Sequence, residues 1–257
     1  MRFWKAHGSL NDFVLVLEED LPERADPSEL AVEMCDRRAG VGADGLILVD
    51  VEPPEVRMRV FNPDGSEAEF CGNAARCVVL LAHEILGENV NRLRSGAGVH
   101  EVTIEDGTIS VEVPGAEVKE VNELGYEVRA GVPHLVRLTE QDPLDPDPRL
   151  RKAASVIRDD IYGGDINVTF ACPVEGNVLR VRTFERGAGW TPACGSGVVA
   201  ASVVYLEVYE GGEGSVEVKT KGGELKTEVE GDRVKLIGPA EITFEGRWLK
   251  LREDPDN

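Results

Sequence analysis

The sequence predicts an α/β (α+β) fold with two pseudo-symmetric domains, each a mixed β-sheet wrapped around a central helix. Three observations lead to this prediction. Short strand-like segments bounded by turn residues outnumber helical segments along the 257-residue chain. A pattern of strand, polar loop, Cys-Gly and apolar segment occurs twice, which indicates two related halves. The apolar segment of the second copy has no polar face, and a helix that is apolar on every side is normally buried.

The spacing of the repeated pattern is the same in both copies. Cys71 lies ten residues after Phe61 in the first copy, and Cys194 lies ten residues after Phe184 in the second. Each cysteine is followed by glycine and then by the apolar segment. The shared spacing predicts that the two cysteines occupy equivalent positions, each at the N-terminus of a central helix.

Periodicity and turn residues predict the individual elements. We expect strands at 1–10, 13–17, 46–51 and 56–61, and a first helix at 27–38 capped by Ser28. A hairpin is expected at 99–113, turning at Asp106-Gly107, and a loop at 141–148. Further strands are expected within 216–236, with turns at Gly222-Gly223 and Gly231-Asp232. The segment 195–208 is expected to be a helix, although its valine content leaves a buried strand at 198–205 open. Turn residues at 114–115 and 122–125 indicate a boundary, so the predicted domains are 1–114 with 246–257, and 115–245.

Composition excludes several function classes. The formal net charge of −20 disfavours nucleic acid or anionic membrane as a partner, because both would be repelled. The longest apolar stretch, 197–206, is too short to span a membrane, and the N-terminus lacks the apolar region of a signal peptide, so a cytoplasmic location is expected. The five cysteines contain no C-x-x-C pair, which argues against a disulfide framework or a zinc ribbon; no metal site is expected.

The two helix-terminal cysteines predict acid–base chemistry. A helix dipole stabilises negative charge at its N-terminus, so each thiol pKa is expected to fall from about 8.5 towards neutrality. The unpaired backbone N–H groups of Gly72, Asn73, Gly195 and Ser196 form an anion site there. One thiolate and one thiol on opposite faces of a bound α-carbon would invert its configuration, and the helix-end amides would stabilise the carbanion without a cofactor. Two such thiols are also expected to form a disulfide in air.

Several segments of the chain resemble diaminopimelate epimerases, and together they cover nearly all of it in the expected order. The segments that carry the resemblance are His7-Gly8-Ser9-Leu10-Asn11-Asp12-Phe13, Gly40 to Gly45, Phe61-Asn62-Pro63-Asp64-Gly65 with Cys71-Gly72-Asn73-Ala74-Ala75-Arg76-Cys77, Glu185-Arg186-Gly187-Ala188-Gly189 with Ala193-Cys194-Gly195-Ser196-Gly197, and Gly238-Pro239-Ala240-Glu241. The resemblance implies a two-domain fold, a homodimer, and interconversion of LL- and meso-diaminopimelate in lysine and cell-wall synthesis.

The resemblance also assigns site residues by matched position. Cys71 and Cys194 would be the acid–base pair. The reacting carboxylate would be held by Gly72, Asn73, Gly195 and Ser196, and the remaining polar groups by Asn11, Asn62, Asn167, Glu185 and Arg186. The guanidinium of Arg186 suits a carboxylate and Glu185 suits an ammonium, although the two could instead form an ordinary surface ion pair.

Three positions depart from the family pattern. Val132 stands where the family commonly has Asn in Gly-Asn-Pro-His, Trp190 stands where it commonly has Glu, and some members have Gln in place of Gly45. Val132 either removes a substrate hydrogen bond or replaces an unneeded polar group, and Trp190 is expected to reshape or cover the site. His134 is interpreted as a buried core histidine in preference to a residue that orients substrate ligands.

Two alternatives to diaminopimelate epimerase stay open. The first is a related racemase or epimerase that acts on another amino acid, which Val132 and Trp190 motivate. The second is a thiol redox or binding protein in which Cys71 and Cys194 cycle between dithiol and disulfide; the lack of a C-x-x-C partner disfavours it.

Overall fold

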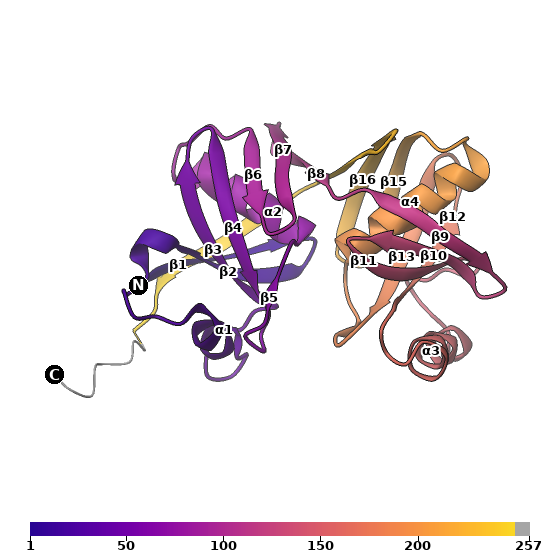
Figure 1. Ribbon diagram of the computed structural model, residues 1–257, viewed down its shortest axis with the longest axis horizontal. Helices are drawn as coiled ribbons and strands as arrows, with labels where there is room; N and C mark the ends of the chain where they lie inside the picture. The colour runs from indigo at the N-terminus through magenta and orange to yellow at the C-terminus, as the bar shows by residue number, and fades with distance from the viewer. Residues whose placement is uncertain (250–257) are drawn as a thin grey trace. The chain divides into compact units, whose positions relative to one another are not determined.

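The computed structural model describes residues 1–249, which form parts of two compact units. Unit 1 contains Met1–Gly8, Asp12–Val99 and the chain from Ala240 onward, and unit 2 contains Ser9–Asn11 and His100–Pro239. Both units combine sheet and helix, as predicted for an α+β protein (Figure 1). Within the described residues, no helix is long and apolar enough to cross a membrane.

The limits of the units differ from the predicted domain limits of 114/115 and 245/246. Strand β8 (Thr108–Val113) pairs with β7 (Gly98–Glu105) on one side and β17 (Arg233–Gly238) on the other, so the hairpin belongs to unit 2. Strand β18 (Glu241–Arg247) pairs with β1 (Arg2–Gly8) and belongs to unit 1. The turn residues at 114–115 therefore connect two strands of one unit. Residues 250–257 of the predicted first domain lie outside the described residues.

Unit 1 contains a mixed sheet, helix α1 and a buried helix α2. Helix α1 (Pro27–Cys35) begins after Asp26, whose carboxylate accepts the Ser28 backbone N–H at 2.9 Å, so Asp26 and not Ser28 is the N-cap. Every residue of α2 (Gly72–Leu80) is buried, and the chain continues as a π-helical turn, Leu81–Ile85. The remaining strands are β2 (Asn11–Leu17), β3 (Gly45–Glu52), β4 (Glu55–Phe61), β5 (Glu67–Ala68) and β6 (Arg92–Ser95).

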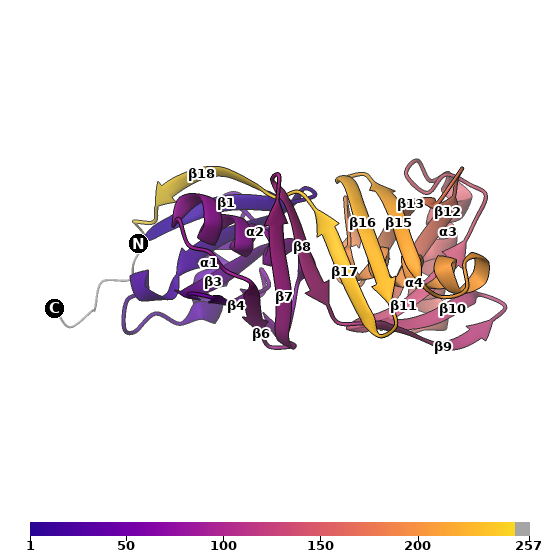
Figure 2. The ribbon, with the colours of Figure 1, turned by 90° about the horizontal axis from the view of Figure 1, so that it is seen from above.

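Unit 2 encloses helix α4 (Gly195–Tyr209), which settles the choice between helix and strand for this segment. Strands β9 to β13 and β15 to β17 contact α4, and Figures 1 and 2 show them around it. The apolar residues from Val198 to Leu206 are therefore buried on all sides, which overrides the modest helix propensity of valine. The remaining elements are β9 (Ala116–Asn122), β10 (Gly125–Ala130), β11 (Val132–Leu138), α3 (Pro148–Ser155) with a π-helical turn (Val156–Ile161), β12 (Asn167–Pro173), β13 (Val178–Glu185), β14 (Gly189–Trp190), β15 (Gly214–Thr220) and β16 (Gly223–Glu230).

The strand pairings repeat from unit 1 to unit 2, as the sequence repeat predicts. In unit 1, β2 is parallel to β3, β3 antiparallel to β4, and β4 parallel to β6. In unit 2, β11, β12, β13 and β15 pair with the same alternation of senses. The registers match residue by residue. Phe61 pairs with Leu46 and Phe184 with Val168, so positions in one unit can be assigned to positions in the other.

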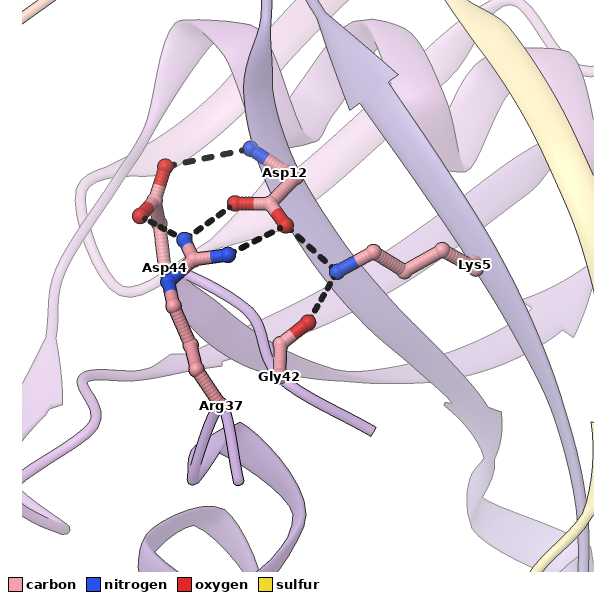
Figure 3. A network of polar contacts seen from close by, with 5 residues as sticks. All are labelled: Lys5, Asp12, Arg37, Gly42 and Asp44. Carbon is pink, nitrogen blue, oxygen red and sulfur yellow. Dashed lines mark hydrogen bonds and ion pairs between the residues drawn. The ribbon is translucent and has the colours of Figure 1, made fainter. Parts of the chain in front are cut away.

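A network of charged side chains fixes the start of β2 in unit 1 (Figure 3). Asp12 accepts hydrogen bonds from Lys5 Nζ at 2.5 Å and from Arg37 Nη2 at 2.7 Å. Arg37 also bonds Asp44 at 2.6 Å, and Lys5 donates to the carbonyl of Gly42. Burial alone would raise the pKa of Asp12, but the hydrogen bonds from Arg37 and Lys5 lower it to about 2. The network therefore ties the 37–44 loop to the strand that begins with Asn11.

Candidate active site

Both cysteines of the repeated pattern cap a buried helix, as predicted. Cys71 precedes α2 with φ −144° and ψ 114°, and Cys194 precedes α4 with φ −120° and ψ 110°. Their carbonyls accept the first helical hydrogen bonds, from Ala75 and Val198, both at 2.9 Å. The first N–H groups of an α-helix lie before its regular series of hydrogen bonds, and together with the helix dipole they favour an anion.

At the α2 end, Cys71, Gly72 and Asn73 lie together in unit 1. The side chain of Cys71 is partly exposed, whereas Asn73 is buried. Asn73 Oδ1 accepts a hydrogen bond from Arg76 Nη2 at 2.8 Å. The strand beside this helix end has glycine at Gly8, where a Cβ atom would lie only 2.8 Å from the Asn73 carbonyl oxygen. This glycine therefore allows β1 to pack closely against the helix end.

At the α4 end, Cys194 and Ser196 contact each other and a histidine in unit 2. Cys194 Sγ lies 3.4 Å from Ser196 Oγ, and Ser196 Oγ lies 2.9 Å from His134 Nε2. His134 comes from β11 and is completely buried. His134 is buried, as a core histidine would be, but it also holds Ser196, so the preference for a purely core role is not upheld.

The hydrogen bonds continue from His134 into the sheet. His134 Nδ1 lies 3.0 Å from Thr169 Oγ1, which lies 3.1 Å from Thr183 Oγ1. Thr169 and Thr183 are directly opposite each other on β12 and β13 and are both buried. Asn167 shares their face of β12, and its Nδ2 lies 3.5 Å from His134 Nε2. A continuous polar series thus runs from the sheet to the Cys194 thiol.

Three further predicted residues of unit 2 also lie close together. Asn167 Oδ1 accepts the backbone N–H of Arg186 at 2.8 Å, which fixes the orientation of the Asn167 amide. Glu185 accepts a hydrogen bond from the hydroxyl of Thr191. The Arg186 side chain is exposed. This arrangement brings an amide, a carboxylate and a guanidinium to the chain segment that leads to Cys194.

Asn62 lies in a turn of unit 1, and Asn11 begins strand β2. Asn62 is exposed at a turn, where its Nδ2 donates to Ser66 Oγ at 2.9 Å and its N–H donates to the Ser66 carbonyl at 2.8 Å. Asp64 Oδ1 accepts the Ser66 N–H at 2.9 Å in the same turn. Asn11 is the first residue of β2, next to the network around Asp12.

The electrostatic environment of Cys194 differs from the expected one. Burial raises the pKa of the Cys194 thiol well above its ordinary value, and the Glu185 carboxylate raises it further. Hydrogen bonds from Ser196 and from the Gly197 backbone N–H act in the opposite direction but are weaker. The prediction of a lowered pKa at Cys194 is therefore wrong, because burial and the Glu185 carboxylate raise it. In this state Cys194 carries its proton.

His134 is neutral throughout the physiological range. Burial lowers its pKa from about 6.5 to about 3. Because the unfolded chain binds this proton more readily, stability is fully present above about pH 6.5 and is lost as the pH falls towards 3. We expect urea unfolding to show a loss from this residue that steepens below pH 6.5 and approaches about 1.4 kcal/mol per pH unit near pH 5.

His134→Gln, which keeps hydrogen-bonding capacity but does not titrate, should reduce that slope. His100 is a necessary reference, because burial also lowers its pKa and His100→Gln should reduce the slope independently. An identical slope in wild type and His134→Gln would contradict the neutral buried state.

Val132 and Trp190, two of the three positions that depart from the family pattern, face different sides of the unit 2 sheet. Trp190 stacks on Phe170 with centroids 6.0 Å apart and contacts Phe184 at 5.3 Å, within the cluster that α3 covers. Thr169 and Thr183 alternate with these aromatic residues and face α4 instead. Trp190 therefore lies on the α3 side of the sheet, opposite the face that carries Thr169 and Thr183, and its effect on the site stays a prediction. Val132 lies two residues before His134 on β11 and shares its face, so this substitution is the one on the α4 side.

Arg76, Thr169 and Thr183 were not identified from the sequence. The repeat contained a signal for Thr183, because a buried hydroxyl there replaces Val60 of the first copy, as the β4 and β13 registers show. Arg76 was quoted only as part of the Cys71 segment. A lone arginine in a helix is normally solvated, so its burial required the tertiary structure.

Comparisons with known proteins agree with this architecture. A family model described as diaminopimelate epimerase matches residues 3–119 and 126–243. A diaminopimelate epimerase of Methanopyrus kandleri is 55% identical over 99% of this chain and 90% of its own length. One from Pelotomaculum thermopropionicum is 37% identical over 96% of this chain and 99% of its own. Among solved structures, a hydroxyproline epimerase of Agrobacterium vitis superposes with a TM-score of 0.69 at 14% identity, covering 96% of this chain and 90% of that one, which shows a shared fold.

Proposed function

Because the chain belongs to the diaminopimelate epimerase family, we propose that it interconverts LL- and meso-diaminopimelate by a cofactor-independent, two-base mechanism. The observation that carries this proposal is that Cys71 and Cys194 cap equivalent buried helices in two units of the same topology. The reaction supplies a precursor for lysine and cell-wall synthesis. The enzyme acts as a homodimer in the cytoplasm.

Inversion requires a base on one face of the α-carbon and an acid on the other. A thiolate removes the α-proton, and the resulting carbanion delocalises its charge onto the substrate carboxylate. Backbone N–H groups of Gly72, Asn73, Gly195 and Ser196 bind that carboxylate and stabilise the added charge. The thiol on the opposite face then delivers its proton. The raised pKa of Cys194 supports its role as this acid when Cys71 is the base.

The remaining polar groups orient the substrate. The Arg186 guanidinium binds a carboxylate, and Glu185 binds an ammonium group. Asn167, Asn62 and Asn11 donate or accept hydrogen bonds at the polar groups of the substrate. Asn167 is the best supported of these, because its Oδ1 is already occupied by the Arg186 N–H, which leaves the Nδ2 of the amide directed towards the side of His134.

Deuterium exchange tests the proposal directly. The reduced enzyme, incubated with LL- or meso-diaminopimelate in D₂O, should incorporate deuterium at the α-carbon and converge on the same mixture of isomers from either side. NMR and chiral chromatography measure the two events. Absence of exchange with both isomers under strong reductant would refute the proposal. A redox protein would likewise show none.

A second candidate is an epimerase for a different amino acid, which one observation favours. Val132 shares the face of β11 that carries His134, and it removes a polar side chain from the site face. Enantiopure amino acids, including lysine, glutamate, proline and hydroxyproline, should be assayed beside diaminopimelate. A larger kcat/KM for one of them than for LL-diaminopimelate would select the second candidate.

A further inference from the structure

Arg76 is a buried cation next to the helix end that Cys71 caps. It is the fifth residue of α2 and has no exposed surface. Its side chain extends back to the first turn, where Nη2 donates to Asn73 Oδ1 at 2.8 Å and Nη1 to the Gly72 carbonyl at 3.3 Å. A Cβ atom on Gly8 would lie 3.1 Å from Nη2, so the glycine leaves the space that the guanidinium occupies.

The equivalent site of unit 2 is built from different residues. Ser196 occupies the position of Asn73, and its side chain is held by His134 from β11 rather than by its own helix. Val199 stands at the position of Arg76. The registers assign His134 to Phe13 of unit 1, because these residues pair with Asn167 and Gly45, respectively.

The rest of the polar series is also replaced in unit 1. Thr169 and Thr183 correspond to Ile47 and Val60 by register, and both of these are buried and apolar. In each unit, the polar residue that follows the Cys-Gly pair is hydrogen-bonded to a buried basic side chain. Asn73 is bonded by Arg76 in unit 1, and Ser196 by His134 in unit 2. That side chain is a neutral histidine beside Cys194 and an arginine beside Cys71.

This difference has opposite effects on the two thiols. His134 carries no charge at neutral pH, because burial lowers its pKa to about 3, and Glu185 adds a negative charge near Cys194. Arginine remains protonated in proteins. Burial lowers the pKa of Arg76, while the electrostatic interactions with Cys77 and Cys71 raise it. The interaction with Cys71 is mutual, so a charged guanidinium favours the Cys71 thiolate.

Among the residues that the structure describes, the other titratable groups around α2 are neutral or exposed. Cys77 is buried, which raises its pKa to about 12 and keeps it neutral. Glu69, two residues before Cys71, is exposed and screened by water. Glu245 of β18 is exposed and paired with Arg2. Strands β1 and β4 contact α2 and carry buried apolar residues, among them Trp4, Ala6 and Val60, with Gly8 at the helix end.

We propose that Arg76 is a positioning residue that fixes Asn73 and holds Cys71 as the thiolate, which makes Cys71 the resident base and Cys194 the resident acid of the free enzyme. The inference rests on the proposed function for the roles of base and acid. Its physical content, a thiol made more acidic by one buried arginine, is independent of the substrate.

The test is the pH dependence of alkylation of Cys71, followed by peptide mapping in a Cys194→Ala background. With Arg76 present, iodoacetamide should modify Cys71 with a midpoint below the ordinary thiol value of about 8.5. Arg76→Met should raise that midpoint by at least about one pH unit, which is about a tenfold slower reaction at pH 7. Arg76→Lys, which keeps the charge, should stay close to the parent. An exposed arginine of the same unit gives the matched control, and Arg57→Met should leave the midpoint unchanged.

A structural role alone would not move this midpoint. An unchanged midpoint in Arg76→Met, or an equal rise in Arg76→Lys, would overturn the proposal. If Arg76→Met does not fold, two single variants that keep Arg76 decide the question. The thiol of Cys71 in Cys194→Ala must then titrate at a lower pH than the thiol of Cys194 in Cys71→Ala. An equal or reversed order would overturn it as well.

The two proposals fail in distinguishable ways. A wild-type protein that exchanges no α-proton of diaminopimelate, but whose Cys71 midpoint rises in Arg76→Met, would refute only the function. An active protein whose Cys71 midpoint is insensitive to Arg76 would refute only the role of Arg76. In an active protein, Arg76→Met should also move the acid limb of kcat/KM for the direction that begins at Cys71 to higher pH.

Discussion

Cys71→Ala and Cys194→Ala are each expected to reduce epimerisation of diaminopimelate by at least about a thousandfold, within the range that positioned acid–base groups contribute. Each face of the α-carbon needs its own proton carrier, so neither thiol can replace the other. Chiral chromatography of the two isomers measures the loss. Because each cysteine caps its helix through the backbone, alanine should leave the fold intact.

Cys172→Ala supplies the matched control for both variants. Cys172 lies in unit 2 and is buried, and its thiol contacts only the carbonyls of Glu140 and Pro173 among the hydrogen bonds of the described chain, both at 3.7 Å. This variant should keep full activity. Retention of more than a tenth of the activity in Cys71→Ala or Cys194→Ala would contradict the two-base mechanism.

Gly197→Ala is expected to be the most disruptive small substitution near the α4 end. A Cβ atom there would overlap Thr183 Oγ1 and would lie 3.1 Å from Thr169 Oγ1. Relieving the overlap requires the helix end to move away from the sheet, at a cost of about 1–3 kcal/mol in unfolding free energy. Because Cys194 and Ser196 move with that helix end, kcat/KM should fall about a hundredfold. Urea unfolding and initial rates measure the two effects.

A second substitution shows whether the overlap is the cause. Thr183→Ala removes the overlapping oxygen and, by itself, loses the hydrogen bond to Thr169, which costs about 1 kcal/mol. The double variant Gly197→Ala with Thr183→Ala should be more stable and more active than Gly197→Ala alone. A double variant no better than Gly197→Ala would show that the Thr183 contact does not limit the position of the helix.

The sequence alone carried the main local features. The spacing from Phe to Cys was the same in both copies, so it predicted equivalent cysteines at helix starts, and both lie there. The hairpin turning at Asp106-Gly107 was predictable because Asp-Gly is favoured in turns whose two central residues need positive φ. Both residues adopt such angles in the structure, 50° and 76°. The apolar residues from 198 to 206 predicted a buried segment and favoured a helix, but the choice between helix and strand needed the structure. These features depend on residues that are adjacent in the chain, so they can be predicted from short stretches of sequence.

Only the tertiary structure decided which distant side chains surround each cysteine. Burial against the sheet raises the pKa of Cys194, which reverses the effect expected from the helix dipole. Because β8 pairs with β17, the hairpin at 98–113 belongs to unit 2 and not to the predicted first domain. Trp190 of β14 lies opposite Phe184 of β13, so both point away from the α4 face. Desolvation and strand pairing depend on residues far apart in the chain. The sequence therefore determined the cysteines and their helices, whereas the packing determined that the Cys194 thiol is desolvated and keeps its proton.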